Sequence, residues 1–403
     1  MTAELAPQPS TPDLPPTASD THTGRRAVGG RLQSLTGLRF IAAFLVLIGH
    51  AAYVPVFADA SAYEYFHAHG LNLGYLGVSV FFVLSGFVLT WVARAGDPAK
   101  SFWRRRAVKI LPTHVVVFGF GVVFLLAQGL PVKPIEATAT LLLVQAWLPD
   151  SSFVIHSVNG ITWSISVELA FYAVFPLLIV WVRRIRPERL VHWFTAVAVA
   201  VLAVPVFSSL FLAGPDSPVL PGLSWAQLWV GYFSPPVRGL ELVAGMLTAR
   251  LISEGRWTLG VGVLPASLAV AGAYVLTLFL PVVYGFGAFF TVPVAVLVAA
   301  LVTRDIQGRG SWLGRRPMVW LGEAAYGFCL INLIVLFTIH MVLGRPVMGT
   351  AAAVLYHLGT GLVCVVVARL LYVLIEMPAT RRWGRKSDAG QRKPKDPAVS
   401  GRV

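Results

Sequence analysis

The sequence predicts an all-α integral membrane protein with about ten transmembrane helices and both termini in the cytoplasm. Three observations carry this prediction. First, 56% of the 403 residues are hydrophobic and 12% are charged, with a mean hydropathy of +0.73, so the charged residues are too few to cover a water-soluble surface. Second, long apolar runs recur along the chain. Third, arginine and lysine cluster between these runs, as the positive-inside rule requires.

The two ends of the chain differ in composition from the middle. Residues 1–30 are rich in Pro, Ser and Thr and have little apolar surface to bury, so we expect a disordered cytoplasmic tail. Residues 379–403 are polar and basic, and we expect a second cytoplasmic tail there. A single membrane domain is therefore predicted over residues 35–378.

Ten apolar runs are long enough to cross a hydrocarbon layer of about 30 Å, which takes roughly 20 helical residues. They begin near Leu38, Leu73, Ile110, Ile161, Leu190, Trp225, Trp257, Val282, Val319 and Thr350.

A further apolar stretch, from Ala137 to Leu148, is too short to cross the membrane and is predicted to be interfacial or re-entrant. Counting it as a span would place the basic loops 94–109 and 183–192 on opposite sides of the membrane, against the positive-inside rule.

The formal net charge of +14 would suggest a nucleic-acid partner in a soluble protein. Here the basic residues form short clusters between apolar runs, such as Arg104–Arg106 and Arg315–Arg316, so the charge indicates membrane topology instead. We therefore expect the lipid bilayer as a partner and no nucleic acid.

Ionisable residues inside apolar helices are costly and usually functional. His50 follows Arg39 by 11 residues in the first apolar run, about 17 Å along a helix axis, which places it near the middle of the membrane or slightly beyond. Glu168 lies in the run that begins at Ile161, about 10 Å below the outer surface, so the two can share a level. A histidine base oriented by a carboxylate is an arrangement that serves acyl transfer.

Two alternatives compete with this interpretation. A His–Glu or His–backbone hydrogen bond can simply hold helices together. His357 falls at a similar depth and is a rival candidate for the base.

The segment FWRRRAVKILP gathers Arg104, Arg105, Arg106 and Lys109 at the start of a helix. These charges can serve the positive-inside rule alone, or they can cradle the phosphates of a nucleotide-containing donor, because arginine binds phosphate oxygens through two hydrogen bonds. Arg238 and Glu241 stand three residues apart in the sixth apolar run, where they can pair with each other or line the same vestibule.

Several enzyme classes lack their motifs. GxxxxGK[ST], GxSxG, HExxH and CxxC are all absent, as is a His with Asp five residues later at His50. His67 and His69 stand in an expected outer loop without a third ligand nearby, so we predict no metal site.

Seven strings in order make the chain resemble an integral membrane acyltransferase of acyltransferase family 3. They are SLTGLRFIAAFLVLIGH, GYLGVSVFFVLSGFVLTW, FWRRRAVKILP, TWSISVELAFYAVFPLL, RGLELVAGM, LGEAAYGFCLIN and YVLIEMP, and they span about Leu35 to Pro378. The resemblance implies that residues 35–378 are a membrane acyltransferase domain.

The family pattern also implies roles for particular residues. Its arginine, ten residues, histidine signature maps onto Arg39 and His50, and the histidine is the expected catalytic base. The basic loop with Arg105, Arg106 and Lys109 is expected on the acyl-CoA side. The other residues that we expect to bind substrate or acyl-CoA, beside the catalytic Glu168, are Trp163, Tyr172, Arg238, Glu241, Tyr326 and Asn332.

This chain departs from the family pattern at two places. The family's second basic-loop arginine is Lys109, which keeps the charge and loses the two-pronged fork. The family's late serine, tyrosine and histidine are Ala325, Tyr326 and Asn332; an asparagine can still donate and accept hydrogen bonds.

The resemblance is nearest to the branch that acylates sugar or macrolide hydroxyls in actinomycetes. It implies a multi-pass enzyme of the bacterial inner membrane that takes an acetyl or other short acyl group from acyl-CoA, a co-substrate rather than a bound cofactor. Envelope polysaccharides or glycolipids are an alternative class of acceptor. A proton-coupled transporter is the alternative from another functional class, since buried His and Glu also suit proton transport.

Overall fold

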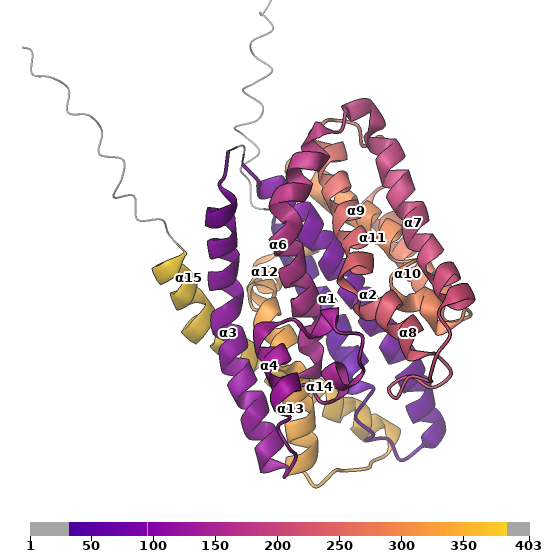
Figure 1. Cartoon of the computed structure of the whole chain (residues 1–403), viewed down its shortest axis with the longest axis vertical. Coiled ribbons are helices and arrows are strands. Elements are labelled where there is room, and N and C mark those ends of the chain that lie inside the picture. Colours follow the sequence, from indigo (N-terminus) through magenta and orange to yellow (C-terminus); the bar gives the residue numbers. More distant parts are fainter. Residues whose placement is uncertain (1–31, 95, 385–403) are drawn as a thin grey trace, which may run out of the picture.

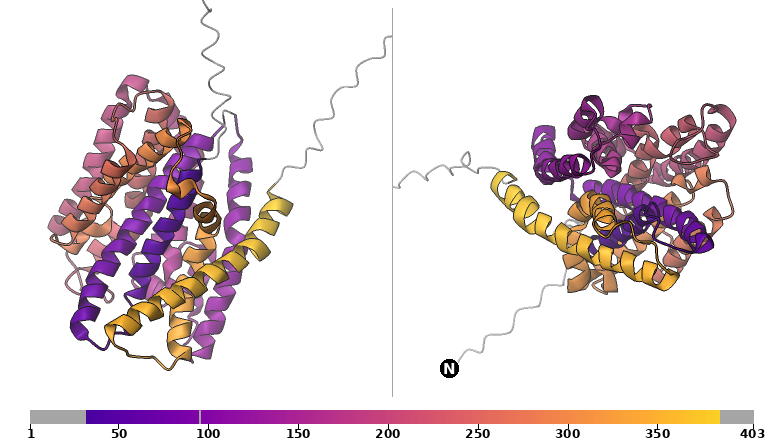
Figure 2. Two further views of the ribbon diagram at one scale, coloured as in Figure 1. Left: turned by 180° about the vertical axis from the view of Figure 1, so that it is seen from behind. Right: turned by 90° about the horizontal axis from the view of Figure 1, so that it is seen from below.

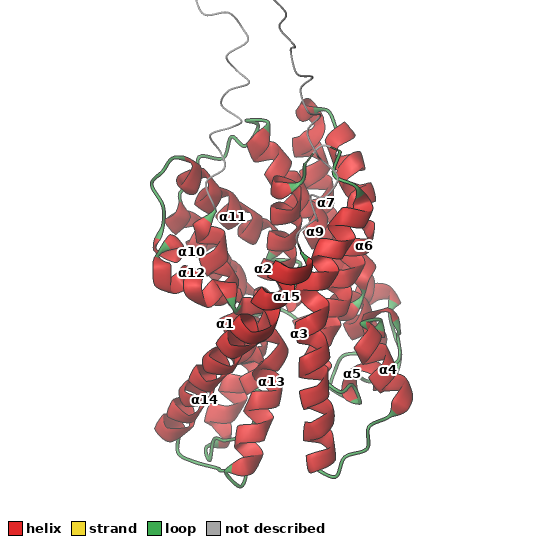
Figure 3. Ribbon diagram, turned by 90° about the vertical axis from the view of Figure 1, so that its left-hand side faces the viewer, coloured by secondary structure: helices red, strands yellow, loops and turns green. Residues whose placement is uncertain are grey.

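The computed structural model describes residues 32–94 and 96–384, which form a bundle of helices aligned mostly along one direction (Figure 1). Within these ranges there is no strand, only helices joined by loops and turns (Figure 3). The expected tail 1–30 lies outside the described residues. Helix α15 (Met377–Trp383) occupies the start of the expected tail 379–403, and residues 385–403 lie outside the described ranges.

Eight helices in the described ranges are long and apolar enough to cross a membrane, some of them together with short helical turns at their ends. They are α1 (Gln33–Ala51), α2 (Ala60–Val92), α3 (Ala99–Ala127), α6 (Trp163–Arg184), α7 (Leu190–Phe211), α11 (Thr291–Ile306), α13 (Ala325–Val342) and α14 (Thr350–Leu371). Most of them run side by side, whereas α14 crosses the bundle obliquely (Figure 2). The chain is therefore an all-α, multi-pass membrane protein.

The remaining elements are shorter or more polar. The α-helices among them are α4 (Pro134–Leu142), α5 (Ser152–Ile155), α8 (Trp225–Leu228), α9 (Pro235–Ser253), α10 (Val263–Thr277), α12 (Arg316–Glu323) and α15. The 3-10 turns are η2 (Gln145–Trp147), η3 (Gly160–Thr162), η4 (Pro187–Arg189), η6 (Val282–Phe286) and η7 (Trp312–Gly314), and the π-helices are η5 (Trp229–Phe233) and η8 (Tyr372–Glu376).

Eight of the ten predicted spans coincide with the eight long apolar helices. The two others, predicted from Trp225 and Trp257, correspond to α9 and α10, which are not among the eight. Helix α10 has 15 residues, about 22 Å of helix against a hydrocarbon layer of about 30 Å. The apolar stretch 137–148 forms no long helix, which confirms that it is too short to be a span. It is divided between α4 and η2, and Leu143 between them has the left-handed conformation.

Two expected boundaries are wrong. His67 and His69 were expected in a loop, but they lie on α2, which begins at Ala60 because the Asp59 carboxylate accepts hydrogen bonds from the first backbone N–H groups. The run expected from Val319 is divided into α12 and α13, with Ala324 between them.

Helix α2 packs on α9 at a close crossing, where Gly86 lies against the Leu242 carbonyl. A Cβ at position 86 would stand 1.9 Å from that oxygen, so Gly86→Ala must force the helices apart. We expect it to cost about 1–3 kcal/mol of stability. Gly119→Ala in α3 is the matched control, because no atom lies within 4 Å of its added Cβ. Thermal unfolding in detergent should show a lower midpoint for Gly86→Ala only; equal midpoints would contradict this packing.

Candidate active site

A cavity of about 1110 Å³ lies inside the bundle, between α1, α2, α3, α6 and α13. One end, which we call the Arg39 end, lies toward the start of α1 and reaches Arg94 and Arg381. The other, which we call the Tyr53 end, lies past the end of α1 and reaches η5. Helix α1 runs from the Arg39 end toward the Tyr53 end and contributes residues along the cavity.

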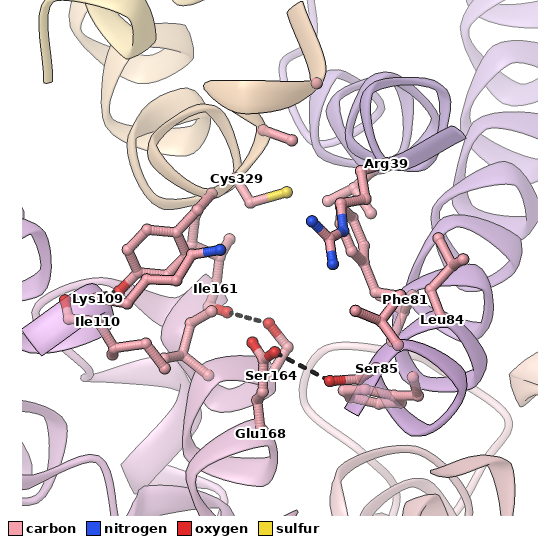
Figure 4. A pocket seen from close by; sticks show the side chains of 18 of the residues that line it. Arg39, Phe81, Leu84, Ser85, Lys109, Ile110, Ile161, Ser164, Glu168 and Cys329 are labelled. Carbon is pink, nitrogen blue, oxygen red and sulfur yellow. Dashed lines mark hydrogen bonds between the residues drawn. The ribbon is translucent and has the colours of Figure 1, made fainter. Parts of the chain in front are cut away.

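Charged side chains of the cavity gather toward the Arg39 end. They comprise five cations and three carboxylates, which makes this half electropositive: Arg39, Arg94, Arg106, Lys109, Arg381, Glu168, Glu323 and Glu376. Figure 4 shows Arg39 and Glu168 reaching into the cavity from different walls, with Lys109 at the left and Cys329 at the top.

Arg106 is held in the cavity wall by two aromatic rings. Its guanidinium carbon lies 5.4 Å from the ring centre of Phe102 and 5.5 Å from that of Tyr172, and its Nε is buried without a hydrogen-bond partner. Within the described ranges, neither Arg39 nor Lys109 forms an ion pair with a carboxylate. Cations without fixed partners around an open cavity are suited to an anionic ligand.

Arg105 does not share this position, although we expected it to bind with Arg106. It does not line the cavity, and its guanidinium pairs with Asp97 outside. The physical reason is helical geometry, because successive residues point about 100° apart and only one of the two can face the cavity.

Glu168 accepts hydrogen bonds from the hydroxyls of Tyr172 and Ser85, the latter at 3.2 Å. Pro176, four residues after Tyr172, has no N–H, so the Tyr172 carbonyl lacks its usual helical donor. The indole Nε1 of Trp103 donates to that carbonyl at 2.9 Å, which joins α3 to α6 beside Arg106.

His50 lines the cavity and pairs with Asn332 rather than with Glu168. The amide Nδ2 of Asn332 donates to the carbonyls of Phe328 and Cys329, each at 3.1 Å, which orients the amide group. The Oδ1 of Asn332 therefore faces His50 and accepts from Nδ1 at 2.7 Å. This bond fixes the proton on Nδ1 and leaves the lone pair on Nε2 available to take a proton.

The expected contact between His50 and Glu168 is therefore wrong: no ion pair joins them among the described residues. Both residues line the same cavity. The shared depth that their positions in the sequence predict does not reveal that an amide on α13 occupies the place beside the imidazole.

Arg238 and Glu241 pair with each other, with Nη1 and Oε1 3.5 Å apart. Both side chains are 2% exposed, and neither lines the large cavity. The guanidinium carbon instead lies 5.1 Å from the ring centre of Phe82 and 5.2 Å from that of Tyr232, two rings that do line it. The structure does not support direct substrate binding by Arg238 and Glu241. This pair lies behind the rings of Phe82 and Tyr232, outside the cavity.

Two more predicted residues, Trp163 and Tyr326, line the cavity. Trp163 is at the start of α6, next to Ser164, whose hydroxyl donates to the Ile161 carbonyl at 3.1 Å. The hydroxyl of Tyr326 donates to the Ile110 carbonyl at 3.0 Å, which ties α13 to α3. Asn332 is absent from the wall itself and acts through His50.

His357, the rival candidate for the base, does not line the cavity. Its ring packs on Phe66 and Phe57, with ring centres 5.2 Å and 5.9 Å away, and both ring nitrogens are buried without partners. Among the two histidines, the geometry favours His50.

Sequence reasoning missed Glu376, which lines the cavity on η8 and is 5% exposed. The sequence did indicate this residue, because Glu376 is an acid in the last apolar run. The cost of burying an ionisable side chain in the membrane, which selected Glu168, applies to Glu376 equally. Tyr75 and Tyr232 carry no comparable signal, since an aromatic residue in a membrane helix is ordinary.

Comparisons with known proteins identify the family of this chain. Residues 32–369 match the family described as "Acyltransferase domain" (Acyl_transf_3). The acyltransferase MdmB of Streptomyces mycarofaciens is 38% identical over 88% of this chain and 93% of its own length. No solved structure matches.

Two relatives have names that mention peptidoglycan. The putative peptidoglycan O-acetyltransferase YrhL of Bacillus subtilis is 26% identical over 82% of this chain and 55% of its own length. The peptidoglycan O-acetyltransferase OatA of Listeria monocytogenes is 23% identical over 64% of this chain and 44% of its own length. The chain thus spans about half the length of these two relatives.

Proposed function

We propose that this chain, which belongs to acyltransferase family 3, transfers an acetyl or other short acyl group from acyl-CoA to a hydroxyl of a sugar or macrolide-type acceptor. The observation that carries the proposal is His50, an imidazole whose tautomer is fixed by Asn332 and whose Nε2 is left free in a cavity with one cationic end.

The donor belongs at the Arg39 end. The phosphates of coenzyme A are anionic, and Arg39, Arg106 and Lys109 surround this end without carboxylate partners of their own. The positive-inside rule places this end at the cytoplasm, together with both termini, where acyl-CoA is available. Glu168 then positions Tyr172 and Ser85 beside the donor instead of orienting His50.

The transfer needs one base and no reactant other than acyl-CoA and the acceptor. Nε2 of His50 takes the proton of the acceptor hydroxyl while the hydroxyl oxygen attacks the thioester carbonyl carbon. As the intermediate collapses, the carbon–sulfur bond breaks, and the imidazolium returns its proton to the departing sulfur. The products are an ester and free coenzyme A.

The donor site predicts a contrast between neighbouring arginines. Arg106→Gln should raise the Michaelis constant for acyl-CoA about tenfold, the lower value for a lost hydrogen bond to a charged group, and should leave that of the acceptor unchanged. Arg105→Gln is the matched control, because Arg105 pairs with Asp97 outside the cavity. Steady-state kinetics with both substrates varied would measure this. If both variants changed the Michaelis constant for acyl-CoA equally, these arginines would have only a role in membrane topology.

The acceptor class has one serious alternative. The relatives named as peptidoglycan O-acetyltransferases favour an envelope polysaccharide or glycolipid. Labelled acetyl-CoA, the purified chain and a panel of macrolides, glycosides and envelope glycans, followed by mass spectrometry, would separate the two. Esters on the small acceptors support the proposal, whereas label on envelope glycans alone supports the alternative.

A further inference from the structure

The Tyr53 end of the cavity differs in chemistry from the Arg39 end. Beyond His50 the described wall consists mainly of aromatic, aliphatic and glycine residues and contains no charged side chain. Four aromatic residues frame it, one from the turn after α1 and three from helices, and we call this region the aromatic chamber: Tyr53, Tyr75, Trp163 and Tyr232.

The chamber adjoins the proposed base because α1 and α2 cross closely there. A Cβ on Gly49 would stand 2.8 Å from the Cα of Gly74, so only glycine permits this approach. The crossing brings together the next residues on each helix, His50 and Tyr75, which both line the cavity. Tyr53 follows one turn after His50, and its N–H donates to the His50 carbonyl at 3.1 Å.

The rings of the chamber hold one another in place. The ring centre of Tyr232 lies 4.6 Å from that of Trp163 and 4.9 Å from that of Tyr75. Behind it, the guanidinium of Arg238 covers the Tyr232 ring, and the Arg238–Glu241 pair is itself buried. The chamber is therefore supported from outside the cavity.

The three tyrosine hydroxyls of the chamber have no hydrogen-bond partner among the described residues. Tyr53 is 41% exposed at the mouth, and the oxygens of Tyr75 and Tyr232 are not sealed within the protein. By contrast, the hydroxyls of Tyr172 and Tyr326 toward the Arg39 end are both bound to protein groups. The free phenols are available to a ligand.

We propose that the aromatic chamber is the acceptor subsite and that it takes a neutral, hydroxyl-bearing ring such as an uncharged glycoside. Aromatic faces provide apolar contact for the ring, and the phenols can donate to and accept from its oxygens. In the described ranges no cationic side chain lines the chamber, and Arg238 behind it is paired with Glu241, so an acidic sugar would lose its hydration without compensation. This inference rests on the proposed function, because it assigns the acceptor of that reaction.

The test compares binding of 4-nitrophenyl β-glucoside with binding of 4-nitrophenyl β-glucuronide, which differ by one carboxylate. Calorimetric titration of the purified full chain should show that the glucoside binds at least about tenfold more tightly. Tyr75→Phe and Tyr232→Phe should each weaken glucoside binding about three- to tenfold, as expected for one neutral hydrogen bond, without changing acetyl-CoA binding. Unchanged acetyl-CoA binding also shows that the variants are folded.

Tyr65→Phe is the matched control, because Tyr65 is on the same helix as Tyr75, is 67% exposed and does not line the cavity. Equal affinity for the two glycosides, no binding of the glucoside, or no difference between Tyr75→Phe and Tyr65→Phe would overturn the assignment. Because binding is measured without turnover, these results are independent of the proposed reaction. Glucoside binding without transfer from acetyl-CoA to any acceptor would contradict the proposed function and leave the chamber supported.

Discussion

His50→Ala is expected to lower the rate of acyl transfer by about 10²–10⁴-fold, the usual contribution of a general base. The reason is that Nε2 is the free imidazole nitrogen in the cavity, and alanine leaves the acceptor hydroxyl without a proton acceptor. Binding of acyl-CoA should persist, because the cations of the Arg39 end are unchanged. Turnover and equilibrium binding of labelled acetyl-CoA would measure the two effects separately.

Two variants serve as controls for this prediction. His357→Ala should be close to wild type, since its ring packs on Phe66 and Phe57 away from the cavity. Glu168→Gln should lose less than His50→Ala, because it perturbs the hydrogen bonds from Tyr172 and Ser85 and not the base. Near-normal turnover of folded His50→Ala protein would exclude His50 as the base.

Asn332→Leu is expected to lower kcat by about 10–100-fold and to leave both Michaelis constants close to their wild-type values. Leucine removes the oxygen that accepts from Nδ1, a hydrogen bond that becomes charge-assisted when His50 gains a proton, worth about 1.5–3 kcal/mol. The bond therefore matters most after the proton has moved. Steady-state kinetics would separate kcat from the Michaelis constants.

Asn332→His is the matched variant, since its ring offers a nitrogen that can accept from Nδ1. We expect it to keep more of the wild-type kcat than Asn332→Leu. If Asn332→Leu raised the Michaelis constants and left kcat intact, Asn332 would be shaping a binding surface and would not be orienting the base.

Much of the fold could be predicted from the sequence because lipid imposes simple rules. Span length and apolar composition identify eight long helices. The same rules are less decisive for helices that are more polar or shorter, such as α9 and α10. The boundary at Asp59 was missed because a helix cap depends on a local hydrogen bond, which hydropathy does not detect.

The sequence predicted many of the residues of the candidate site, but it predicted few of the contacts between them. The cost of burying charge singled out His50 and Glu168, the family resemblance added Arg39, and all three line one cavity. Which group lies beside His50 depends on the rotation and height of α13, which no pattern within α1 or α6 encodes. The same limit applies to Arg238, whose helix turns it behind Tyr232 and away from the cavity.

The most direct test of the central claim is the balance between coenzyme A released and ester formed. The purified chain in liposomes would be given labelled acetyl-CoA and an accepted hydroxyl compound, and both products would be counted. We predict one ester for each free coenzyme A, with both products lost in His50→Ala. Proton-dependent solute uptake by the same liposomes without ester formation, or ester formation that persists in His50→Ala, would contradict the account.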